Sequence, residues 1–237
     1  MTHSALLTLA VALGLRHGVD PDHMAAIDGL SRLRPSRWNG VAFAIGHGAI
    51  VTLLAVGIGG LLARTVGPYA PWLLILLGVV NLWRLKAPAV HHHRGLSRFF
   101  RTSPLLLGFL FGAGFETASQ LSALVLAANI NPWLLGALFS AGMIVVDGVD
   151  GYLAFRTQIQ AALAGSRRAT RASRALGIFV VIFSFGLGGA ELLKLDVDRI
   201  ALPLGCMLFV YLIALRVWSQ RELKTTIGLA PGESKSL

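Results

Sequence analysis

One stretch sets the architecture of this chain: Leu15-Arg16-His17-Gly18-Val19-Asp20-Pro21-Asp22-His23-Met24-Ala25-Ala26-Ile27-Asp28. It places three carboxylates, two imidazoles and a guanidinium within an otherwise apolar run from Ser4 to Ser31. If that run is one membrane helix, ionisable groups near its middle cost several kcal/mol unless they face a partner, a water-filled cavity or an ion. A bound cation is the simplest explanation for them.

The proline in this stretch predicts an interruption of the helix. In an unbroken helix, Asp22 and His23 would point away from the face that carries His17. Pro21 lacks an N–H, and its ring clashes with the carbonyl of His17, so the helix should kink or open there. A freed carbonyl and redirected side chains would then let His17, Asp22 and His23 converge. Secondary transporters build binding sites from helices broken in this way.

The composition is that of an integral membrane protein. Of the 237 residues, 55% are hydrophobic and 14% are charged, and the chain is long enough for about six to eight spans of roughly 20 residues. The net charge of +10 lies in short loops between apolar runs, which indicates a lipid bilayer rather than nucleic acid as the partner. We expect an all-α transmembrane domain over residues 1–220 and a polar cytoplasmic tail over 221–237.

About seven apolar runs are expected to cross the membrane. They cover approximately residues 4–31, 41–63, 71–85, 105–128, 133–155, 176–193 and 200–218. The connections after the first, third and fifth runs carry three, five and five basic residues, and the region from Arg216 carries four. The other three connections carry one, none and two. Because basic loops stay inside, this polytopic chain should have its N-terminus outside and its C-terminus in the cytoplasm.

Seven of the 11 acidic residues lie within these apolar runs: Asp20, Asp22, Asp28, Glu116, Asp147, Asp150 and Glu191. Local partners exist for two of them, since Arg16 can reach Asp20 and Arg32 can reach Asp28 at four-residue spacing. Asp22, Glu116, Asp147 and Asp150 are left without one. An assembly of anions across several helices therefore implies a compensating cation.

Some positions have both a structural and a functional interpretation. A single imidazole such as His47 can be satisfied by one hydrogen bond in a core, but its flanking glycines leave space for a second helix or an ion. Glu116 is either a neutral, hydrogen-bonded side chain or the partner of a cation. Glu191 is expected to be structural, paired with Lys194. The tract His91, His92 and His93 lies in a long polar connection, outside the expected transport site.

Imidazole and carboxylate are typical ligands of first-row divalent metals, which leaves Ni²⁺, Co²⁺, Zn²⁺ and Mn²⁺ as candidates. The chain has no Walker sequence, so ATP could act only through a separate subunit, and nothing in the sequence requires one. Entry of a divalent cation into a cell whose interior is electrically negative is favoured by about 4.6 kcal/mol per 100 mV. We expect a permease rather than an enzyme, with the metal ion as substrate and no cofactor.

Four motifs follow one another along the chain: Gly14 through Asp28, Gly46-His47-Gly48, Gly114-Phe115-Glu116-Thr117-Ala118-Ser119-Gln120, and Gly142-Met143 through Asp147-Gly148-Val149-Asp150-Gly151. In this order they resemble the signature elements of the nickel/cobalt transporter family (NiCoT). The resemblance implies a secondary permease for Ni²⁺ or Co²⁺ in the cytoplasmic membrane. It assigns metal binding to His17, Asp20, Asp22, His23 and His47. Further along the path, or behind these ligands, we expect Asp28, Glu116, Asp147 and Asp150.

The chain departs from the family pattern at four points. Pro21 stands where alanine is usual, Glu116 replaces aspartate, and Gln120 replaces glutamate, which removes a negative charge from the expected path. The helix that normally precedes the signature helix is missing, which agrees with an external N-terminus, or else the protein starts upstream. The alternatives are an exporter of the same superfamily, a membrane metal-binding accessory protein, and an intramembrane metalloenzyme, although His-Glu-x-x-His is absent.

Overall fold

The structure is a computed structural model that describes residues 2–86, 104–114, 118–163, 167–195 and 198–227. These residues are almost entirely helical and include no strand, so the expected all-α class is confirmed for them. The helices are α1 (His3–Gly18), α2 (Pro21–Leu33), α3 (Asn39–Ala55), α4 (Gly60–Val66), α5 (Ala70–Lys86), α7 (Pro104–Gly114), α8 (Ala118–Leu126), α9 (Pro132–Leu163), α10 (Arg167–Leu192) and α11 (Asp198–Ile227), and a 3-10 turn (Gly67–Tyr69) links α4 to α5.

The bundle has the lengths and surfaces of a multi-pass membrane protein. Within the described range, three helices are long and apolar enough to cross a membrane, at Pro132–Ala162, Arg167–Leu192 and Leu202–Ser219. Shorter apolar helices lie at Asn39–Ala55, Ala70–Leu85 and Pro104–Gly114. Trp72, Trp83 and Val210 are among the many large apolar side chains left exposed, as a hydrocarbon environment requires. The count of seven spans and the orientation of the termini stay predictions.

The first apolar run forms two helices, which confirms the interruption predicted at Pro21. α1 ends at Gly18, and Asp20 is extended (φ −65°, ψ 140°) before Pro21 opens α2. Proline suits this first helical position because its missing N–H would have had no partner there. The carbonyl of His17 is not free, since it accepts the Asp20 N–H at 3.0 Å. The break therefore redirects side chains and does not offer that carbonyl as a ligand.

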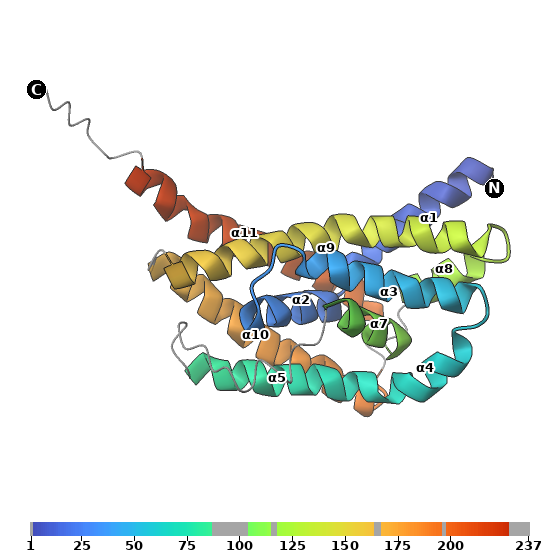
Figure 1. The fold of residues 1–237 in the computed structure, drawn as a ribbon, viewed down its shortest axis with the longest axis horizontal. Coiled ribbons are helices and arrows are strands. Elements are labelled where there is room, and N and C mark those ends of the chain that lie inside the picture. Colours follow the sequence, from blue (N-terminus) through green and yellow to red (C-terminus); the bar gives the residue numbers. More distant parts are fainter. Residues whose placement is uncertain (1, 87–103, 115–117, 164–166, 196–197, 228–237) are drawn as a thin grey trace, which may run out of the picture.

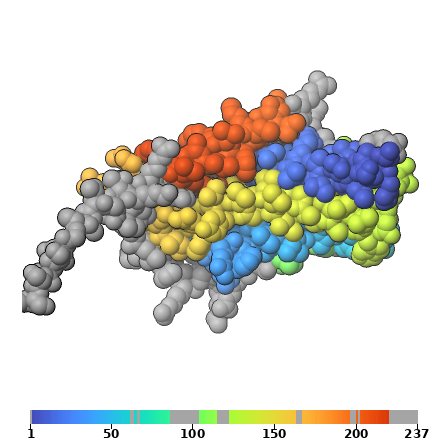
Figure 2. All heavy atoms as spheres, turned by 90° about the horizontal axis from the view of Figure 1, so that it is seen from above, coloured from blue at the N-terminus to red at the C-terminus, as the bar shows by residue number. Residues whose placement is uncertain are grey.

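α9 is the long helix around which the candidate site is assembled. It packs extensively against α1 and α3 and also contacts α2, α10 and α11. Figure 2 shows α1 (blue) and α11 (red to orange) lying along the same side of α9 (yellow). A Cβ on Gly14 would lie 2.0 Å from the carbonyl oxygen of Phe139, and one on Gly40 would lie 1.8 Å from that of Asp147. Glycine at these two positions lets the backbones of α1 and α3 meet α9.

Tertiary contacts replace the local ion pair that was predicted for α2. Asp28 binds Arg216 of α11 instead of Arg32. Arg32 donates from Nε to Asn81 of α5 at 3.2 Å, and from Nη1 to the carbonyl and hydroxyl oxygens of Ser173 of α10. Arg32 thus joins three helices, and the prediction based on four-residue spacing is wrong for this residue.

Candidate metal centre

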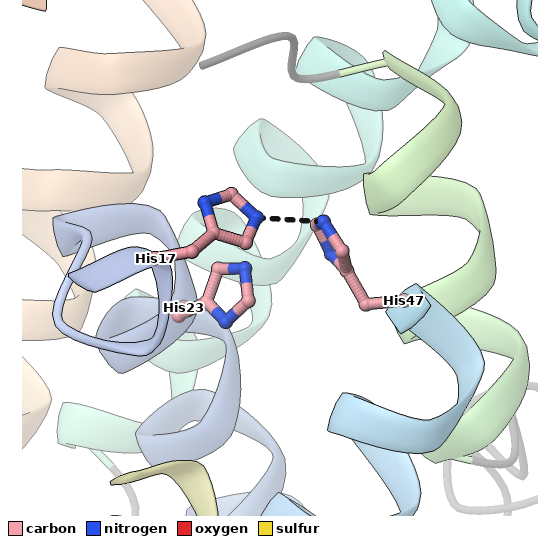
Figure 3. A group of neighbouring side chains, drawn as sticks. All are labelled: His17, His23 and His47. Atoms are coloured by element: carbon pink, nitrogen blue, oxygen red, sulfur yellow. Dashed lines mark hydrogen bonds between the residues drawn. The ribbon is translucent and has the colours of Figure 1, made fainter. Parts of the chain in front are cut away.

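Three histidines meet in the interior of the bundle. His17 lies in the last turn of α1, His23 in the first turn of α2, and His47 in α3, and all three are fully buried. One ligand atom from each lies within 4.8 Å of the others, and Figure 3 shows the three rings gathered around a common space. The Nε2 atoms of His17 and His47 are hydrogen-bonded at 2.8 Å. The break between α1 and α2 brings the first two histidines together, and α3 supplies the third.

Carboxylates hold two of the imidazoles from behind. His17 Nδ1 donates to Asp20 Oδ2 at 2.9 Å, and His23 Nδ1 donates to Asp147 Oδ2 at 3.1 Å. A neutral histidine that is protonated on Nδ1 keeps its lone pair on Nε2. Metal-binding histidines are commonly oriented by a carboxylate in this way. Both pairs therefore leave an Nε2 atom suited to a metal ion.

The spacing of the nitrogens fits a first-row divalent metal. Imidazole nitrogens lie about 2.0–2.1 Å from such an ion, so two of them at a right angle are about 3.0 Å apart. The 2.8 Å between His17 Nε2 and His47 Nε2 is close to that value. His23 Nε2 is buried without a hydrogen-bond partner, a cost that a bound ion would remove. The two carboxylates of Asp20 and Asp147 match the charge of a divalent cation.

Aromatic rings enclose the three imidazoles. The ring centroid of Phe139 lies 5.4 Å from that of His17, and the centroid of Phe43 lies 5.0 Å from that of His23. Phe111 of α7 packs edge-on against Phe43 at 5.7 Å. Apolar walls lower the local dielectric and strengthen the interaction of an ion with the carboxylates.

The structure brings His47, and not Asp22, to His17 and His23. Asp22 is 6% exposed, but it is outside the three-histidine group. Asp28 and Asp150 are buried and bind Arg216. Glu116, the side chain of Gln120 and the tract His91 to His93 lie outside the described part of the chain.

The interpretation of the sequence missed one residue, Arg216. It was counted with the basic C-terminal region, yet it is fully buried in α11. Its Nη2 donates to Asp28 Oδ1 at 2.6 Å, and its Nη1 donates to Asp150 Oδ1 at 2.5 Å. A signal was available, because an arginine inside the apolar run from 200 to 218 needs a partner.

Fold and site together define a class: multi-pass helical membrane proteins with a buried centre of imidazoles and carboxylates. The family model described as high-affinity nickel-transport protein (NicO) matches residues 4–68 and 85–218. The chain belongs to this family, and the resemblance to nickel/cobalt transporters is confirmed.

Curated relatives carry names from nickel and cobalt transport. The chain is 32% identical to the hydrogenase nickel incorporation protein HupN of Bradyrhizobium diazoefficiens. This alignment of 256 residues covers 85% of this chain and 67% of the relative. It is 33% identical to the nickel transporter NixA of Staphylococcus aureus, over 60% of this chain and 59% of that one. It is 29% identical to the cobalt transport protein NhlF of Rhodococcus rhodochrous, over 60% and 57%. The chain thus spans between about half and two thirds of these relatives, and no solved structure matches it.

Proposed function

We propose that this chain is a secondary permease that takes up Ni²⁺ or Co²⁺ across the cytoplasmic membrane. The observation that carries the proposal is the group of three buried imidazoles, His17, His23 and His47, whose ligand atoms lie within 4.8 Å of one another. Family membership and the names of the relatives support nickel or cobalt as the substrate.

In this proposal the ion exchanges its water for the three imidazole nitrogens. With His17 protonated on Nδ1, the proton between His17 Nε2 and His47 Nε2 belongs to His47, and it moves to His47 Nδ1 before the ion binds, because a metal ligand must present its lone pair. Asp20 and Asp147 orient two of the rings and balance the charge of the ion. Asp22 adds a third carboxylate beside His23, and its buried Oδ2 has no hydrogen-bond partner. We include Asp22 as a ligand during entry or release of the ion.

In this proposal the membrane potential sets the direction of transport, and the basic loops give the orientation of the chain in the membrane. Seven crossings with an external N-terminus put the end of the bundle at which α9 and α11 finish on the cytoplasmic side. α1 begins at the opposite end of the bundle (Figure 1). A divalent ion that moves inward gains about 4.6 kcal/mol per 100 mV. Uptake in this scheme needs no ATPase subunit.

Uptake of radioactive nickel into cells that express the chain tests the proposal. His47→Ala removes one of three nitrogen ligands, so we expect uptake to fall by roughly tenfold or more, with an unchanged amount of protein in the membrane. His92→Ala, in the polar connection, is the histidine control and should transport normally. Normal uptake by His47→Ala would refute the site, and lower accumulation than in cells without the chain would reverse the direction.

A second candidate function is that of a membrane accessory protein that binds nickel without moving it. The name of HupN, a hydrogenase nickel incorporation protein, favours this candidate. Sealed vesicles that contain the purified chain separate the two functions. Accumulation of nickel in the lumen supports a permease, whereas tight binding without accumulation supports an accessory protein.

A further inference from the structure

A buried ion triad lies next to the histidine centre. Arg216 of α11 binds Asp28 of α2 at 2.6 Å and Asp150 of α9 at 2.5 Å, and it also donates to the Asp150 carbonyl at 3.2 Å. The three side chains are at most 1% exposed. One guanidinium therefore neutralises two carboxylates from two different helices.

The triad continues the histidine centre along the same pair of helices. Asp28 follows His23 by five residues on α2, and Asp150 follows Asp147 by three residues on α9, which are rises of about 7.5 Å and 4.5 Å. α2 and α9 are in contact, and the bonds His23 to Asp147 and Asp28 to Arg216 to Asp150 both bridge the two helices. The two layers are consecutive, and the second lies toward the end of the bundle where α9 finishes (Figure 1).

Arg216 does not satisfy this second layer completely. The Oδ2 atoms of Asp28 and Asp150 are buried without a hydrogen-bond partner, and so is Nε of Arg216. With two carboxylates and one guanidinium, the layer keeps one negative charge in the protein interior. It therefore keeps the capacity to bind a further cation, and carboxylate oxygen is an accepted ligand for divalent metals.

We propose that Asp28 and Asp150 form a second station for the transported divalent ion, and that Arg216 is the resident cation which the ion displaces. This inference rests on the proposed function, because it needs an ion that leaves the histidine centre. An arginine stays charged under all relevant conditions, so Arg216 can yield its place only by movement of its side chain. Two bare carboxylates would retain a divalent ion, and a resident guanidinium keeps the station weak enough for release.

Equilibrium dialysis of the purified full chain against Ni²⁺ tests the station. We expect one ion per chain in the wild type and two in Arg216→Gln, and we expect the double variant Arg216→Gln with Asp28→Asn to return to one. Arg84→Gln is the matched control, since Arg84 is half-buried and donates to the carbonyls of Arg32 and Leu33 at the end of α2. It should bind one ion. An Arg216→Gln variant that elutes and melts as a folded protein but binds one ion would overturn the station.

The two proposals fail in different ways. Binding of Ni²⁺ by His47→Ala at the wild-type stoichiometry would overturn the histidine centre. The second station is tested separately, in the double variant His47→Ala with Arg216→Gln. That double variant lacks the histidine centre, so we expect its single ion to be lost when Asp28→Asn is added. Retention of the ion after that third change would overturn the station.

Asp28→Asn alone provides a test that does not depend on the folding of Arg216 variants. It leaves Arg216 paired with Asp150 and removes one ligand from the station. We expect nickel uptake into vesicles to fall about tenfold or more, while the Kd for Ni²⁺ changes by less than about threefold. Unchanged uptake, or an equal loss of binding and uptake, would show a merely structural role and overturn the proposal.

Discussion

Replacement of Asp147 by asparagine tests how much the carboxylate behind His23 contributes to ion binding. In the Asp147→Asn variant, the amide oxygen of the new side chain can still accept from His23 Nδ1, where the carboxylate now does so at 3.1 Å. The orientation and tautomer of the imidazole are therefore kept, and what disappears is the negative charge. Asp147→Ala removes both the charge and the hydrogen bond.

The geometry sets an upper limit on the loss of Ni²⁺ binding free energy in Asp147→Asn, namely the full Coulomb energy between the ion and the carboxylate. An ion on His23 Nε2 would lie roughly 7 Å from the Asp147 carboxylate, where a divalent and a single charge interact by about 5 kcal/mol at an effective dielectric of about 20. Loss of a carboxylate behind a metal-binding histidine usually weakens binding by about 10–100-fold, or roughly 1.4–2.7 kcal/mol. We expect Asp147→Asn to fall within that range and Asp147→Ala to lie at or beyond its upper end.

Titration of the purified chain with Ni²⁺ measures this change directly, and vesicle uptake measures its effect on transport. Glu191→Gln, which makes the same change at an exposed carboxylate on α10, is the control and should bind as the wild type does. A Kd for Asp147→Asn within twofold of the wild-type value would refute the idea that Asp147 supports the ion through His23.

The remaining predictions concern the ligands, the packing and the choice of metal. His17→Ala and Asp22→Ala are expected to abolish uptake of radioactive nickel while the protein still reaches the membrane, as measured by uptake and immunoblotting. Gly40→Ala places a Cβ 1.8 Å from the carbonyl oxygen of Asp147, so α3 and α9 must separate. We expect its melting temperature to fall by about 3 °C or more and its uptake to fall with it, whereas Gly186→Ala, whose Cβ meets nothing within 4 Å, should leave both unchanged. In competition assays, excess Co²⁺ should lower nickel uptake more than excess Mn²⁺, because imidazole nitrogens suit Co²⁺ and Mn²⁺ prefers oxygen. Equal inhibition by the two ions would contradict a site built from three imidazoles.

Local features of the sequence were sufficient for the helical class and for the broken first span. A proline acts on the carbonyl four residues before it, so Pro21 alone indicated an interruption close to its observed place. The apolar runs gave the approximate positions of the helical segments, although the runs 41–63 and 105–128 each contain two helices in the structure. Only the extent of the break was left open, because the proline allowed either a kink or an opening, and the structure has Asp20 in an extended conformation between two separate helices.

The partners of the charged groups depended on tertiary structure. Asp147 meets His23 across 124 residues, and Arg216 meets Asp28 across 188 residues. Sequence spacing favoured Arg32 as the partner of Asp28 because both lie on one helix, but the packing of α2 against α10 and α5 gave Arg32 other acceptors.

The sequence by itself determined that this chain is an apolar helical bundle with imidazoles and carboxylates inside it, since both properties follow from residue type and short-range spacing. Only the tertiary structure decided that His47 joins His17 and His23, and that an arginine from α11 lies between two buried carboxylates. The physical reason is that a buried charge must have a partner, but nothing local specifies which helix supplies it. That choice is made by the close packing of α1, α3 and α11 on α9.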